Sequence, residues 1–473
     1  MNTTLNQKKL SPKNKWGYAI GEFGEATGYN LFYFFFLFFL TDVAGLPPAV
    51  AGTISSIAIF WDAVTDLIIG HWSDNFNSKY GRRRPFMIAV AIPYAICTYL
   101  MFCNFEMELN VKIAYAIILS MVFWTCYTIF VIPYMALGAE MTQDSDERTS
   151  LRTYAAIFIH VGTMIAASTP PIIVEKSMQM GMTEEKGWAN VGLIIGIVIL
   201  LGIVICWYLT KGTELPVEKT EVKKEEKVNI VITIIEILKL KPSIPLAVAV
   251  FCGAFVCTMV SSGQVYVMTN NLGFGAGLQS IMLIVVPAMA IAVLPIIRGI
   301  SSWRDNRTSF MLCMFIGGIG LAVFWIIGIH GVVSYIIWGF FFQMANSSLW
   351  ALYYAMMYDI SELDEFKNDK RREGIITAVM AFFQKIGGSI ATWATGMILA
   401  AGAYDGTAAV QADSALDAIF NICTVIPGAI CVIGGIALII YPITGGRHAA
   451  LRQALDAKRE GKEYSIEGFE KML

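Results

Sequence analysis

The chain has 473 residues, of which 56% are hydrophobic and only 15% are charged. Soluble globular proteins are about 45–50% apolar and about 25% charged, so this composition is that of a protein solvated mostly by lipid. The nine cysteines include no CxxC pair and the four histidines are scattered, so neither a disulfide framework nor a metal centre is expected. The formal net charge of −2 gives no reason to expect a nucleic acid partner.

Twelve apolar runs have roughly the 20 residues that a helix needs to cross a ~30 Å hydrocarbon core. They fall near residues 17–40, 49–72, 85–104, 111–139, 153–174, 189–210, 243–268, 278–298, 309–329, 333–358, 374–402 and 416–442. We therefore expect an all-α integral membrane protein with twelve transmembrane helices. An even number of spans places both chain ends on the same side.

The distribution of positive charge predicts which side that is. Thirty of the 34 lysines and arginines fall in the two chain ends and in the loops after runs 2, 4, 6, 8 and 10. The opposite loops hold Lys112, Lys176 and Lys186, and Lys385 lies inside a run. Because cytoplasmic loops carry an excess of Lys and Arg, both ends are expected in the cytoplasm.

A mixed-charge segment over 211–241 divides the runs into two groups of six. Tyr134 to Arg152 can be laid over Tyr354 to Arg372, which indicates a weak internal repeat. Two six-helix bundles related by a parallel repeat are the architecture of the major facilitator superfamily. The expected parts are an N-terminal cytoplasmic tail (1–16), a first bundle (17–210), a cytoplasmic linker (211–241), a second bundle (242–445) and a C-terminal cytoplasmic tail (446–473).

The second run contains two carboxylates, Asp62 and Asp66. One carboxylate at the centre of a membrane helix costs roughly 2.5 to 3.5 kcal/mol on insertion scales. Four residues apart, the two share one helix face and repel each other unless a cation or proton lies beside them. This predicts a cation site; an ion pair with a basic residue on a neighbouring helix is the alternative, and both can hold.

Several motifs carry a resemblance to one family of that superfamily. They are Thr41-Asp42-Val43-Ala44-Gly45, Trp61-Asp62-Ala63 with Asp66, the loop from Gly70 to Gly81-Arg82-Arg83-Arg84-Pro85, Ile132-Pro133-Tyr134, Arg371-Arg372-Glu373-Gly374 and Tyr441-Pro442. From about Trp16 to Arg447 the chain resembles the glycoside-pentoside-hexuronide:cation symporters. The resemblance implies a cation-coupled sugar importer that works by alternating access.

The resemblance also implies roles for individual residues. The family's sodium site matches Asp62, Asp66, Thr65 and Thr128, and because Thr65 stands where an asparagine is usual, the choice between Na⁺ and H⁺ stays open. Lys385 matches a lysine of span 11, where it either contacts substrate or compensates charge. The aspartates that bind α-galactosides are replaced here by Ala26 and Val131, which argues against such a substrate.

The expected substrate is therefore an anionic sugar of the glucuronide type, with a neutral disaccharide or a lysolipid-like amphiphile as alternatives. Aromatic rings stack on the apolar faces of sugars. The candidate substrate residues are Lys385, Trp350, Tyr127, Trp124, Tyr29, Tyr33, Glu25 and Glu22. The two glutamates could serve as a proton relay, as gate contacts to the basic loops, or only as acids that reach the cytoplasmic surface.

Charged residues after spans 2, 4 and 10 are expected to form cytoplasmic salt bridges that break when the inner side opens. They are Asp74, Arg82, Arg83, Arg148, Asp359, Glu365, Arg371 and Glu373. No Ser/His/Asp grouping, phosphate loop or HExxH motif is present in the sequence, so an enzyme is not expected. We expect a monomer in the bacterial inner membrane, with the lipid bilayer, the sugar and the coupling ion as its partners and no other cofactor.

Overall fold

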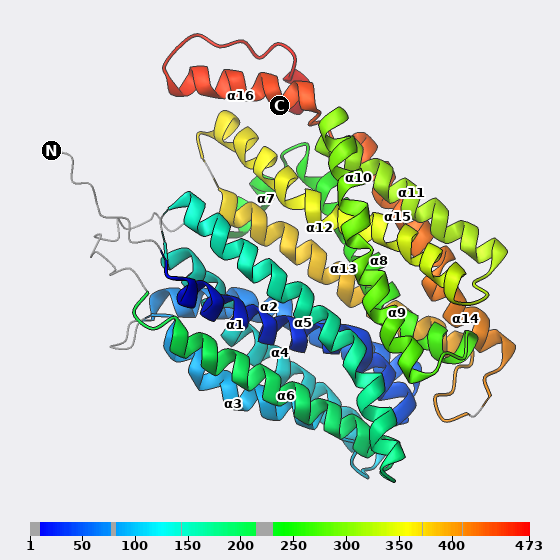
Figure 1. Ribbon diagram of the computed structural model, residues 1–473. Helices are drawn as coiled ribbons and strands as arrows, with labels where there is room; N and C mark the ends of the chain where they lie inside the picture. Colours follow the sequence, from blue (N-terminus) through cyan, green and yellow to red (C-terminus); the bar gives the residue numbers. More distant parts are fainter. Residues whose placement is uncertain (1–9, 77–81, 143, 214–229, 371, 409) are drawn as a thin grey trace. The chain divides into compact units, whose positions relative to one another are not determined.

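The computed structural model describes residues 10–76, 82–142, 144–213, 230–370, 372–408 and 410–473, without the side chains of residues 67, 71, 74, 75, 145, 146 and 230–232. All regular secondary structure in these ranges is helical. The chain forms two compact units (Figure 1). Unit 1 comprises Met1–Glu221, Phe274–Ile284 and Tyr404–Gln411, and unit 2 comprises Val222–Gly273, Val285–Ala403 and Ala412–Leu473. The five-part division expected from the sequence stays a prediction.

Unit 1 is built from six helices. They are α1 (Pro12–Leu31), which continues through π-helical turns at Phe32–Phe36 and Phe39–Val43, α2 (Pro48–Asn75), α3 (Arg84–Met101), α4 (Leu109–Glu140), α5 (Ser145–Gln179) and α6 (Glu184–Leu209). Prolines begin α1 and α2, where their missing N–H has no helical partner to lose. The side chain of Ser11 caps α1 by accepting a hydrogen bond from the backbone N–H of Asn14.

Helices α1 and α6 pack with their backbones in contact. A Cβ atom added to Gly202 would lie 3.1 Å from the Cα atom of Gly24, and one added to Gly17 would overlap the side chain of Leu209. Small residues at such positions let membrane helices approach closely, which increases their van der Waals contact. The glycines of α1 therefore position this helix, which carries Glu22 and Glu25, against the rest of unit 1.

Most of the helices of unit 2 follow in chain order. They are α7 (Ile230–Leu238), α8 (Ser243–Tyr266) with a π-helical turn at Val267–Asn271, α10 (Ala290–Trp303), α11 (Asn306–Ile327), α12 (Val332–Asn368), α13 (Glu373–Ala401), α14 (Asp413–Cys423), α15 (Val425–Ile440), α16 (Gly445–Arg459) and a 3₁₀ turn at Glu470–Met472. Helix α9 (Ala276–Ala288) begins among the residues of unit 1 and ends among those of unit 2.

Two of the expected single spans are divided into two helices each. Helices α9 and α10 meet at Met289, two residues after Pro287, and α14 and α15 meet at Thr424, three residues before Pro427. Proline has no N–H to donate to the preceding turn, so the helical hydrogen bonding is interrupted beside it. The carbonyl of Val286, next to the first break, accepts a hydrogen bond from the side chain of Gln343 at 3.0 Å.

In the described ranges, ten helical segments are long and apolar enough to cross a membrane. They are α2 to α6, α8 with its π-helical turn, α9 with α10, α11, α13, and α14 with α15. Helices α1 and α12 are not in this group; α1 carries two glutamates, and α12 continues past residue 358 into a charged segment. The count of twelve spans and the cytoplasmic chain ends stay predictions.

Candidate cation and substrate site

The four residues expected to bind a cation lie together in unit 1. The hydroxyl of Thr128, on α4, is 3.0 Å from Oδ1 of Asp62 and 3.3 Å from Oδ1 of Asp66, both on α2. The Oγ1 atoms of Thr65 and Thr128 are 3.1 Å apart. Asp62 is only 1% exposed. Two carboxylates on one hydroxyl, with a second hydroxyl beside it, make a set of oxygen ligands suited to a hard cation, and either carboxylate can instead hold a proton.

One further polar contact aligns α2 with α4 beside this cluster. The indole Nε1 of Trp61 donates a hydrogen bond to the hydroxyl of Thr125 at 2.9 Å. Thr125 precedes Thr128 by three residues, so the two hydroxyls lie on the same face of α4. The sequence analysis did not identify Thr125, although its spacing from Thr128 was visible there.

Aromatic candidates gather next to this cluster, on α1 and α4. The ring centroids of Tyr29 and Tyr33 are 4.5 Å apart, and those of Trp124 and Tyr127 are 5.0 Å apart. Tyr29 contacts both rings of α4, at 5.8 Å each. Trp124 is fully buried, so in this structure it supports the tyrosines. Tyr29 and Tyr33 are half-buried.

The two glutamates of α1 have different surroundings. Glu25 accepts a hydrogen bond from the hydroxyl of Tyr127. Glu22 is 1% exposed, and its Oε1 lies 3.8 Å from Nη1 of Arg152. Among the described residues, neither oxygen of Glu22 accepts a hydrogen bond. Glu22 therefore keeps one distant cation as a neighbour, whereas Glu25 is attached to the aromatic cluster.

In unit 2, a chain of hydrogen bonds orients Trp350 on α12. Its indole Nε1 donates to Oδ1 of Asn346 at 3.2 Å, and Nδ2 of Asn346 donates to Oε1 of Gln343 at 3.0 Å. The amide of Gln343 donates in turn to the carbonyl of Val286, at the break between α9 and α10. The indole remains 41% exposed. The sequence analysis named Trp350 but neither amide.

Lys385 lies half-buried on α13, one residue after Gln384, which accepts a hydrogen bond from the hydroxyl of Tyr353 at 3.3 Å. Lys385 belongs to unit 2 and the two aspartates belong to unit 1. A contact between them therefore stays a prediction.

The predicted gating residues of unit 1 contact helix ends. Nε of Arg83 donates to Glu140 at 3.0 Å, and its Nη1 donates to the hydroxyl of Ser73 at 2.8 Å. Arg148 donates to the carbonyl of Thr142 at 2.8 Å. Nε of Arg82 has no hydrogen-bond partner among the described residues. The side chain of Asp74 and residue Arg371 lie outside the described part of the chain.

In unit 2, the predicted gating acids of α12 contact the C-terminal helix α16. Asp359 lies 3.4 Å from Nε2 of His448, and Glu365 binds Arg459 through two hydrogen bonds of 2.7 and 2.8 Å. Burial raises the pKa of Asp359 to about 6, against the opposing effect of His448. Glu373 is half-buried in the first turn of α13.

The sequence analysis missed the most buried ion pair of unit 2. Asp364 is fully buried and accepts two hydrogen bonds from Arg372, at 2.6 and 2.8 Å. Arg372 also pairs with Glu236 of α7. These contacts allow the charged end of α12 to stay helical beyond the apolar run.

Another buried acid follows α1 in unit 1. Asp42 accepts hydrogen bonds from the hydroxyls of Thr41 and Tyr404, each at 2.6 Å. Burial raises the pKa of Asp42 to about 7, although these two hydrogen bonds act in the opposite direction. The motif containing Asp42 was noted in the sequence, but the partner Tyr404 lies far along the chain.

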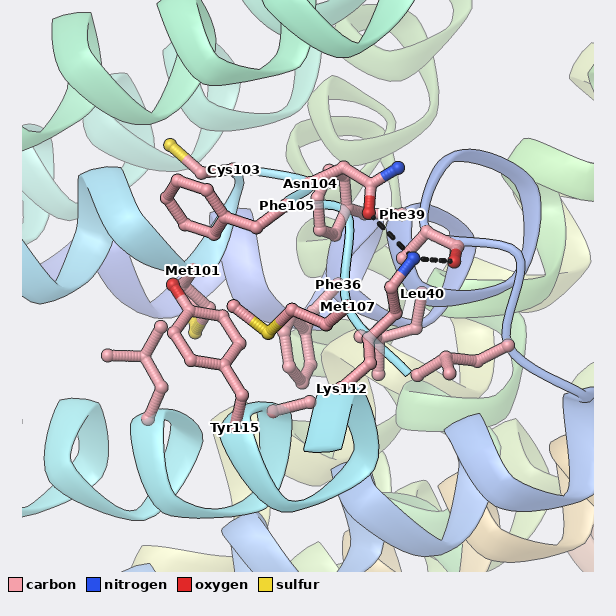
Figure 2. A pocket seen from close by; sticks show the side chains of 14 residues that line it. Phe36, Phe39, Leu40, Met101, Cys103, Asn104, Phe105, Met107, Lys112 and Tyr115 are labelled. Carbon is pink, nitrogen blue, oxygen red and sulfur yellow. Dashed lines mark hydrogen bonds between the residues drawn. The ribbon is translucent and has the colours of Figure 1, made fainter. Parts of the chain in front are cut away.

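A small apolar pocket of unit 1 contains none of the predicted substrate residues. Figure 2 shows it between Phe36, Met101, Tyr115 and neighbouring side chains, with Lys112 at one side. The amine of Lys112 donates to the carbonyl of Ala44 and to Oδ1 of Asn104, each at 3.0 Å. The volume of about 20 Å³ suits a single water molecule, so this pocket is too small for a sugar.

Comparison with known proteins decides the family. Residues 17–445 match the family described as MFS/sugar transport protein. The chain belongs to this family. The resemblance to the glycoside-pentoside-hexuronide:cation symporters is thereby confirmed, and its members among the relatives are transporters.

Relatives of this MFS/sugar transport protein match over nearly their whole length. An uncharacterized symporter of Synechocystis sp. is 27% identical, over 97% of this chain and 99% of its own. The glucuronide carrier protein homolog of Escherichia coli is 22% identical, over 98% of this chain and 99% of its own. A structure from work on proton-dependent oligopeptide transporters superposes with a TM-score of 0.66 at 14% identity, over 94% of this chain and 100% of that one, which shows the fold alone.

Proposed function

We propose that this protein carries a sugar across the bacterial inner membrane by symport with Na⁺ or H⁺. The observation that supports this most directly is the pair of carboxylates around Thr128 in the interior of unit 1. In this proposal, cation binding at Asp62 and Asp66 favours sugar binding in the outward-open state. Release into the cytoplasm follows a rocking motion of two six-helix bundles. Twelve spans, cytoplasmic chain ends, a monomeric state and the absence of enzymatic activity belong to the same proposal.

The test of coupling is uptake into proteoliposomes under an imposed Na⁺ or proton gradient. Asp62→Asn and Asp66→Asn remove the negative charge with little change in shape, and each should abolish gradient-driven uptake. Glu106→Gln is the matched control, because Glu106 is exposed and lies outside the cluster. Gradient-driven uptake by an Asp62→Asn, Asp66→Asn double variant equal to that of the wild type would contradict the proposal.

For the substrate, we propose an anionic sugar of the glucuronide class. Lys385 supplies a cation on α13, and one relative is named a glucuronide carrier homologue. The exposed indole of Trp350 and the pair Tyr29 and Tyr33 offer ring faces on which a pyranose can stack. Calorimetry with glucuronides, neutral disaccharides and lysolipids tests this choice. Binding of a glucuronide that weakens in Lys385→Ala supports it; binding only of neutral sugars, or only of lysolipids, overturns it.

A further inference from the structure

A cavity lined by arginine lies where three helices of unit 2 end. It has a volume of about 550 Å³, and its lining includes Trp303, Arg304, Asp305, Arg307 and Thr444. Helix α10 ends at Trp303, α11 begins at Asn306, and α16 begins at Gly445, four residues after the end of α15. None of the residues proposed for cation or sugar binding belongs to it.

The helix boundaries place this cavity at the surface of the membrane. The membrane-capable segments Ala276–Trp303 and Asn306–Ile327 are separated only by Arg304 and Asp305. A turn that short between two spans must lie where the hydrocarbon core meets the headgroups. Trp303 is 72% exposed, and tryptophan is enriched at this depth because its ring is apolar and its N–H is polar.

The cavity carries a net positive charge because its one acid is occupied. Oδ1 of Asp305 accepts from the backbone N–H of Thr308 at 2.6 Å, and its Oδ2 accepts from that of Gly445 at 3.1 Å. The carboxylate therefore caps the first turns of α11 and α16. Its charge is directed at two helix ends, which leaves the arginines to a ligand.

The two arginines are held in different ways. Arg307 donates to the carbonyls of Leu438 and Ile439 at the end of α15, which fixes its planar group while a guanidinium has five N–H donors in all. The guanidinium of Arg304 lies 5.4 Å from the ring centroid of Trp303 and is exposed. One fixed and one exposed guanidinium can bind a phosphate from two sides.

We propose that this cavity binds the headgroup of an anionic phospholipid. Its phosphate would lie between Arg304 and Arg307, with its acyl chains beside Trp303 in the hydrocarbon core. Basic pockets at the ends of membrane helices suit such headgroups, since each arginine near the surface contributes about 1 kcal/mol of attraction. The proposal is independent of the transported substrate, so it can hold or fail separately from sugar symport.

The test is lipid retention by the purified protein, measured by native mass spectrometry after reconstitution in phosphatidylcholine with increasing phosphatidylglycerol. We expect the wild type to retain phosphatidylglycerol, and Arg304→Gln to bind it about fivefold more weakly, the factor equivalent to about 1 kcal/mol. Arg304→Gln should fold, because the printed contact of its guanidinium is with the neighbouring ring. Arg298→Gln, an exposed arginine of α10 outside the cavity lining, is the matched control and should bind like the wild type.

Three results would overturn the proposal. Equal weakening by Arg304→Gln and Arg298→Gln would mean general attraction to a basic surface. Equal retention of phosphatidylcholine would remove the role of charge. Displacement of the lipid by millimolar inorganic phosphate, with phosphate itself binding in an Arg304-dependent way, would assign the cavity to a soluble anion.

Discussion

The hydroxyl of Thr128 lies 3.0 Å from the carboxylate of Asp62, and the same hydroxyl lies 3.3 Å from Asp66. A hydroxyl has one proton and therefore donates to only one of these carboxylates at a time. Its lone pairs remain available to a cation bound between them. Thr128 thus links the two acids and can serve as a ligand itself.

The first prediction concerns this hydroxyl. Thr128→Ala should weaken the apparent affinity for the coupling ion by about tenfold, because a hydrogen bond to a charged group contributes about 1.5 to 3 kcal/mol. The measurement is sugar uptake as a function of Na⁺ concentration and of pH. Thr128→Ser keeps the hydroxyl and should retain most of the affinity; if serine and alanine behave alike, the hydroxyl has no part in ion binding.

The second prediction concerns the hydrogen bond between Tyr127 and Glu25. Tyr127→Phe keeps the ring in the aromatic cluster but removes the donor from a carboxylate in the interior, which should cost about 1 to 3 kcal/mol of stability. Thermal unfolding in detergent measures this loss. Tyr115→Phe is the comparison, since Tyr115 donates to the backbone carbonyl of Leu100 and its loss should cost less.

A Glu25→Gln background sharpens this test. If the hydrogen bond is the cause, Tyr127→Phe should lose less stability when Glu25 is already an uncharged amide. An equal loss in both backgrounds would show that the effect comes from ring packing.

The third prediction concerns the orientation of Trp350. Asn346→Ala removes the acceptor of its indole N–H and should raise the half-saturating sugar concentration several-fold, with a smaller change in maximal rate. Uptake kinetics separate these two quantities. Ser348→Ala, a buried change on the same helix whose hydroxyl bonds only locally to Ala345, is the control. Unchanged sugar affinity in Asn346→Ala would remove the positioning role.

The fourth prediction follows from the raised pKa of Asp42, about 7. An unfolded aspartate has a pKa near 3.9, so between about pH 4 and pH 7 the folded protein binds the proton more tightly than the unfolded chain does. The contribution of this group to stability is therefore complete below about pH 4 and is lost as the pH rises to 7.

Thermal unfolding across that pH range measures this effect. Asp42→Asn cannot titrate and should flatten the decrease in stability, whereas Glu106→Gln should follow the wild type. A decrease of the same size in Asp42→Asn would assign the pH dependence to other groups.

The sequence predicted the parts of this protein that depend on local spacing. The four-residue interval between Asp62 and Asp66 was sufficient to place both on one face of α2, and the family resemblance supplied Thr128. In contrast, the hydrogen bond from Gln343 to Val286 depends on where a proline interrupts a helix 57 residues earlier in the chain. The extension of α12 past residue 358 depends on Arg372 and Arg459, which neutralise its acids through tertiary contacts that periodicity does not reveal.

The backbone contact between Gly24 and Gly202 has a practical consequence for measuring motion. Two helices without side chains between them cannot slide past each other without a clash, so α1 and α6 should keep a constant separation throughout a transport cycle. Spin labels on exposed positions of these two helices would therefore supply an internal ruler. Distance changes recorded elsewhere in the protein could be calibrated against it.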